Sequence, residues 1–154
     1  MVLINNLLDM KRIIILIMIL LPFSVMAQKR ATLDELMMEY SSKTHCTTIN
    51  LSSGMLKTMG VDMDADTLKA ISVSDTALIA RFKQQISKLV EGFEQVMFVN
   101  SNGHSVEIYQ RSDKSGSITD LVIVTHEGGE CVMTYIRGKN LELSAVNAYS
   151  GAKR

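Results

Sequence analysis

The chain has 154 residues, with 16 Lys and Arg against 16 Asp and Glu, so its formal net charge is zero. A neutral chain offers no electrostatic basis for binding nucleic acid or an anionic membrane surface, because both require concentrated positive charge. We therefore expect no nucleic-acid partner, and the length is typical of one domain that buries a single core.

The first 27 residues follow the pattern of a cleavable export signal. Lys11 and Arg12 form a short basic region, and the unbroken apolar run 13–21 comes directly after them. Ala27 then supplies the small residue that signal peptidase requires, so the sequence predicts cleavage between Ala27 and Gln28.

An uncleaved membrane anchor is the alternative for this segment. The apolar run is shorter than the roughly 20 residues that a spanning helix needs, and charged residues follow it at once. We therefore expect residues 1–27 to be removed and residues 28–154 to form a single exported domain. No later segment is long and apolar enough to span a bilayer, so we expect no transmembrane segment in the mature chain.

The region after the signal begins with a capping box. Thr32 and Glu35 stand three residues apart before an apolar stripe, which predicts a helix that runs to about Tyr40. The β-branched stretch 46–51 predicts a strand, and a short helix ending at Gly60 follows it.

The middle of the chain contains the clearest amphipathic helix. Apolar residues recur at three- and four-residue steps between Ser74, which is the predicted N-cap, and Gly92. The stretch 61–73 before it is predicted to be mostly loop, with a short strand at 68–73. The stripe comprises Leu78, Ile79, Phe82, Ile86, Leu89 and Val90.

The C-terminal half is typical of an antiparallel meander, because four β-rich stretches are separated by glycine-containing turns. A short closing helix is expected at 144–149. The sequence therefore predicts an α+β fold, in which amphipathic helices pack on one face of a mainly antiparallel sheet of four to five strands. The four stretches are 94–99, 105–111, 117–125 and 131–137.

Several of these segments resemble a known family. The stretches 49–52, 106–109, 120–124 and 135–141 are similar to the domain of unknown function 4252 family, and the resemblance extends over about residues 30–149. The resemblance implies a small exported protein in the periplasm or outer envelope of a Gram-negative bacterium. It implies no reaction and no site residues.

Two cysteines follow the predicted signal. Outside the cytoplasm, thiols that meet are usually oxidised, so Cys46 and Cys131 are candidates for a disulfide. Such a bridge stabilises a domain by roughly 2–4 kcal/mol. The alternative is two separate buried thiols, which pack as small apolar side chains.

Histidines provide the candidate metal ligands. In a meander, the turns near His104 and His126 fall at the same end of the sheet, and imidazole is a common zinc ligand. Their spacing matches no known zinc motif. Met55, Met59 and Met63 are four residues apart and thioethers bind Cu(I), but methionines more often fill apolar cores. We expect no cofactor.

No catalytic motif is present in the sequence, neither a nucleophile elbow nor a phosphate-binding glycine loop. This favours a non-catalytic binding, accessory or regulatory module of the envelope over an enzyme. Its expected partner is another envelope protein or a small ligand. The alternative function is a metal-dependent enzyme that uses the rim of the sheet bearing His104 and His126.

Overall fold

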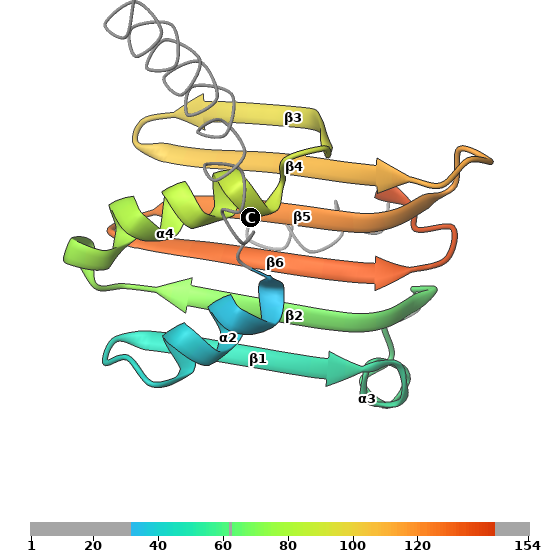
Figure 1. Cartoon of the computed structure of the whole chain (residues 1–154), viewed down its shortest axis with the longest axis horizontal. Helices are drawn as coiled ribbons and strands as arrows, with labels where there is room; N and C mark the ends of the chain where they lie inside the picture. Colours follow the sequence, from blue (N-terminus) through green and yellow to red (C-terminus); the bar gives the residue numbers. More distant parts are fainter. Residues whose placement is uncertain (1–31, 62, 144–154) are drawn as a thin grey trace, which may run out of the picture. The chain divides into compact units, whose positions relative to one another are not determined.

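The computed structural model describes residues 32–61 and 63–143, which form one antiparallel sheet with helices packed against it (Figure 1). The predicted signal, the cleavage site at Ala27 and Gln28, and the predicted closing helix at 144–149 lie outside these residues. No helix within them is long and apolar enough to cross a membrane.

The described elements are three helices and six strands. The helices are α2 (Leu33–Ser41), α3 (Ser53–Thr58) and α4 (Thr76–Leu89). The strands are β1 (Cys46–Ser52), β2 (Ala65–Val73), β3 (Glu94–Ser101), β4 (His104–Ser112), β5 (Ile118–Glu127) and β6 (Glu130–Gly138).

The strand order in the sheet is β1-β2-β6-β5-β4-β3, and every neighbouring pair is antiparallel. The predicted α+β class and the meander from β3 to β6 are confirmed. The predicted number of four to five strands is too low, because the sheet has six. The short strand predicted at 68–73 is confirmed as part of β2, which begins earlier, at Ala65, within the stretch expected to be mostly loop. Asp66 and Thr67 at its start conceal the strand pattern in the sequence.

The helices divide between the two faces of the sheet. Helices α2 and α4 cover the face that carries Val73, Val122 and Met133, which we call the helix face (Figure 1). Leu56 of α3 instead packs with Leu121 and Ile136 on the opposite face, which we call the open face. The prediction that the helices pack on one face is therefore correct for α2 and α4 and wrong for α3.

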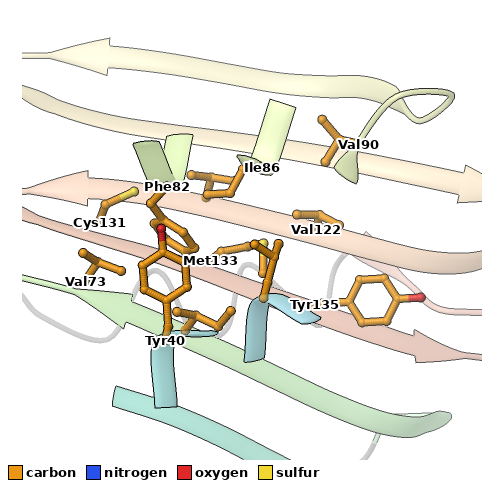
Figure 2. Packing of buried hydrophobic residues seen from close by; sticks show 12 residues of the cluster. Tyr40, Val73, Phe82, Ile86, Val90, Val122, Cys131, Met133 and Tyr135 are labelled. Atoms are coloured by element: carbon orange, nitrogen blue, oxygen red, sulfur yellow. The ribbon is translucent and has the colours of Figure 1, made fainter. Parts of the chain in front are cut away.

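The largest core residues lie between the helix face and its two helices. Tyr40 of α2 and Phe82 of α4 are fully buried, with ring centroids 4.8 Å apart (Figure 2). The Tyr40 hydroxyl donates a hydrogen bond of 2.6 Å to Gln85 Oε1, and Gln85 Nε2 donates to Glu39. The apolar contact and the polar chain together fix α2 against α4.

The helix starts follow local capping chemistry. The predicted capping box of α2 is confirmed, because Thr32 and Glu35 each accept from the other's backbone N–H. Helix α4 is capped by Asp75, whose carboxylate accepts from the Ala77 N–H at 2.9 Å. The predicted cap, Ser74, instead donates from its hydroxyl to the His45 carbonyl.

Gly138, the last residue of β6, allows the chain that enters β2 to approach the sheet closely. A Cβ at this position would overlap the Asp64 carbonyl oxygen and come within 2.9 Å of the Ala65 Cα. The Lys139 N–H then donates to the Asp64 carbonyl at 3.0 Å. The close approach holds the start of β2 beside the end of β6.

Candidate ligand-binding site

A hollow of about 410 Å³ opens on the open face of the sheet. Its floor comes from four strands, with Leu51 in β1, Leu68 in β2, Ile123 in β5 and Ile136 in β6. Its volume lies within the range of small-molecule sites. The remaining lining residues are Leu56, Met59, Val61, Met63, Thr125 and Thr134.

The wall of the hollow is built by the connection from α3 to β2. Gly60 ends the helix with a φ of 75°, and the Val61 N–H donates to the Leu56 carbonyl at 3.0 Å. These bonds turn the chain back over the open face, so that Met59, Val61 and Met63 border the hollow. The predicted C-cap role of Gly60 thus helps to shape the site.

The lining is almost wholly apolar. Among residues 32–61 and 63–143, no charged residue lines the hollow, and the polar side chains of this described lining are Thr125 and Thr134. Two methionines in the wall give the hollow an adaptable shape, because unbranched thioether side chains repack readily. The described lining can hold an apolar ligand, and it contains no titratable side chain for acid–base chemistry.

A smaller and more polar cleft of about 220 Å³ lies on the helix face between α4, β4 and β5. The Tyr109 hydroxyl donates a hydrogen bond to Glu107, and the polar lining also includes Lys83, Ser87, Ser105 and His126. Burial and the bond to Glu107 raise the pKa of Tyr109 to about 12. A phenol that stays protonated at neutral pH is a poor base, so this cleft is a weak candidate for catalysis.

Asp120 forms a buried ionic cluster on the helix face. Its carboxylate accepts from Tyr135, from Thr119 at 2.8 Å, and from Nε of both Arg111 and Arg137 at 3.1 Å. Burial alone raises the pKa of Asp120, but the hydrogen bonds from Arg111, Tyr135 and Thr119 outweigh it and lower the pKa to about 2. The cluster ties β4, β5 and β6 together.

The structure does not bring the two cysteines together. Cys46 and Cys131 both lie opposite Val73, one on each side of β2. Two strand spacings separate their backbones by roughly 10 Å, whereas a disulfide requires Cα atoms within about 7 Å. Both thiols are free, so the register argues against the predicted bridge.

The two thiols are expected to differ in reactivity. Cys131 is fully buried, and burial raises the pKa of its thiol to about 11, so its thiolate is scarce at neutral pH. Cys46 is half-buried. In a thiol titration with an aromatic disulfide and no reductant, we expect one thiol to react in the native protein and two after unfolding in guanidinium.

The Cys46→Ser variant is the control for this titration, with no reactive thiol expected in its native state. Wild-type protein that shows no thiol either before or after unfolding would contradict the separation of the two cysteines.

The histidines share an end of the sheet but not a face. Ser105 lies opposite His126 in the register, so His104 projects from the other face. His104 Nδ1 lies 3.3 Å from a carboxylate oxygen of Glu127. Within residues 32–61 and 63–143, no three His, Cys, Asp or Glu side chains gather as metal ligands.

The three methionines of the predicted series do not all lie at one site. Met59 and Met63 border the hollow, whereas Met55 is exposed on α3 and is not part of the lining. The series therefore contributes apolar surface to the candidate site.

A comparison with known protein families agrees with the resemblance seen in the sequence. The domain of unknown function 4252 (DUF4252) family matches residues 40–149, which is most of the chain. The chain therefore belongs to this family. No curated protein and no solved structure matches it.

Proposed function

We propose that this is a non-catalytic envelope protein that binds an apolar small molecule, of the acyl-chain class, in the hollow on the open face. The observation that carries the proposal is the hollow itself, a cavity of about 410 Å³ whose lining within the described part of the chain is eight apolar residues and two threonines. An uncharged aliphatic chain matches this lining, and a polar headgroup would remain at the mouth in water.

The side chains outside the hollow support a non-catalytic role. Burial holds the pKa of the Cys131 thiol at about 11, and burial and Glu107 hold that of Tyr109 at about 12. Neither is an activated nucleophile or a base at neutral pH. Asp120 is fully engaged by its hydrogen-bond donors.

The envelope location is supported by the export pattern before Gln28 and by what the family resemblance implies. An exported protein with an apolar cavity is suited to hold a lipid or fatty acid outside the cytoplasm. The alternative, a metal-dependent enzyme at His104 and His126, lacks geometric support because these residues project from opposite faces.

The test is calorimetric titration with dodecanoate below its micelle concentration. Burial of about ten methylene groups at about 0.8 kcal/mol each favours binding by about 8 kcal/mol, and the loss of translational and rotational freedom opposes it by about 4 kcal/mol, so we expect a Kd on the order of 1 mM. We expect the Thr134→Phe variant, which fills the hollow, to bind at least about tenfold more weakly. Absence of binding by the wild-type protein would refute the proposal.

Matched variants separate occupation of the hollow from general surface binding. Thr47→Phe makes the same change on an exposed part of the open face and should leave the affinity unchanged. Met59→Asp places a charge beside the hollow and should weaken binding, whereas Met38→Asp changes a similarly exposed methionine on α2 and should not.

A further inference from the structure

The outer edge of β3 is an exposed apolar strand at the end of the sheet. Strand β3 pairs with β4 on one side, and no other strand of the described residues 32–61 and 63–143 pairs with it on the other. No charged residue and no proline stands between Glu94 and His104. Four consecutive apolar residues in it are exposed, namely Val96 (37%), Met97 (40%), Phe98 (59%) and Val99 (50%).

Such an edge is unusual in a protein that stays monomeric. Exposed edge strands are normally protected by lysine, proline, a pronounced bulge or a covering element, because their unpaired backbone groups invite another strand. In the part of the chain that the structure describes, the only such feature of β3 is the register shift at Val96, and the strand is regular from Met97 to Ser101.

We propose that β3 pairs antiparallel with β3 of a second copy of the chain, across a twofold axis that passes beside Phe98. The two sheets then become one continuous sheet through both subunits. This interface is independent of the hollow, which lies nearer the other end of the strand order.

The side-chain pattern of β3 is self-complementary in this arrangement. A twofold axis perpendicular to the sheet preserves its faces, so each residue lies opposite one on the same face. With the axis beside Phe98, the Phe98 side chains of the two subunits lie opposite each other on the helix face. Met97 lies opposite Val99 on the open face, where both already adjoin β4. Apolar residues therefore meet on both faces.

The charges favour the antiparallel orientation and a second copy. Glu94 stands at one end of β3, so antiparallel pairing places the two Glu94 side chains at opposite ends of the interface. Parallel pairing would place them side by side, where like charges destabilise a sheet. The chain has zero net charge, so two copies do not repel each other as a whole.

The opposite edge of the sheet is a weaker candidate. Strand β1 exposes only one large apolar residue, Ile49 (46%), and α2 and α3 both pack near it. A contact between β1 of one copy and β3 of another joins two different surfaces and continues as an open filament unless its rotation closes a ring. The isologous β3 pair closes as a dimer.

The experiment is sedimentation velocity on protein expressed from the 154-residue sequence and purified after export. A single strand pair is a small interface, so we expect a monomer–dimer equilibrium with a Kd on the order of 10 µM. Phe98→Lys should weaken dimerisation at least about tenfold, because it buries two lysines opposite each other. The matched control on the other edge, Ile49→Lys, should leave it unchanged.

Hydrogen exchange locates the interface directly. We expect the amides of residues 94–101 to become more protected as protein concentration rises, while those of β1 do not change. Because Phe98 is exposed, the lysine variant should keep the wild-type circular dichroism spectrum. If it does not, Val99→Lys provides the same test.

Three results would overturn the proposal. The first is a monomer at every concentration up to about 500 µM, well above the expected Kd. The second is a dimer that survives Phe98→Lys. The third is an assembly larger than a dimer that Ile49→Lys abolishes. The first would assign the edge to a different protein, and the last would identify a filament built through both edges.

Discussion

Replacement of Phe82 by alanine is expected to lower the free energy of unfolding by about 3–5 kcal/mol. Phe82 is completely buried between α4 and the helix face, with its ring beside that of Tyr40 (Figure 2). Its removal deletes apolar contacts and leaves a cavity that the rigid sheet cannot fill. Domains of this size have total stabilities of about 5–15 kcal/mol, so the variant approaches the limit of folding.

Phe98→Ala is the matched control, because Phe98 is 59% exposed on β3. Urea unfolding of both variants measures the difference, and the control should be destabilised by less than about 1 kcal/mol when measured as a monomer. Equal losses for the two variants would show that α4 does not pack on the sheet as described.

Replacement of Asp120 by asparagine is expected to lower the free energy of unfolding by about 2–3 kcal/mol at neutral pH. The carboxylate is 2% exposed and bound by Arg111, Arg137, Tyr135 and Thr119. Asparagine has a similar shape but no charge, so it cannot form the same ionic bonds with both arginines.

The effect should depend on pH in a defined direction. The pKa of Asp120 is lowered in the folded protein to about 2 from 3.8, so its ionised form stabilises the fold. This stabilisation is fully present above about pH 5 and is lost as the pH falls through 3.8 toward 2. The difference between wild type and Asp120→Asn should therefore shrink over that interval.

Asp66→Asn, at an exposed position of β2, is the control for the acid titration and should follow the wild type. A constant difference between wild type and Asp120→Asn from pH 7 to pH 2 would show that the charge of Asp120 does not stabilise the fold.

Local features of the fold were predictable because their causes lie within a few residues. The capping box of α2 needs only Thr32 and Glu35, and the β3–β4 turn needs only Asn102 and Gly103, both at positive φ. The apolar period of α4 likewise predicts a buried face, although its cap moved by one residue to Asp75.

The candidate site was not predictable, because its lining comes from distant segments. Leu51, Leu68 and Ile136 meet only because β2 lies between β1 and β6, an order that no local pattern encodes. The signal that was available in the sequence was the methionine series, of which Met59 and Met63 border the hollow.

Two site predictions made from the sequence, the histidine rim and the disulfide, depended on the register of the strands in the sheet. The meander correctly places His104 and His126 at one end of the sheet, but an offset of one residue puts them on opposite faces. Cys46 and Cys131 share a face, yet Val73 stands between them. The predicted cellular compartment and the amino-acid composition cannot show on which face the histidines lie or which residue separates the cysteines.

The most direct test of apolar-ligand binding in the hollow is methyl NMR of protein labelled with ¹³C at the methionine methyl groups, titrated with dodecanoate. Met59 and Met63 border the hollow, whereas Met38 lies on α2 and Met97 on β3. We expect saturable shifts of the Met59 and Met63 signals, with Met38 and Met97 unchanged. Shifts confined to Met38 or Met97, or no shifts at all, would contradict a binding site in the hollow.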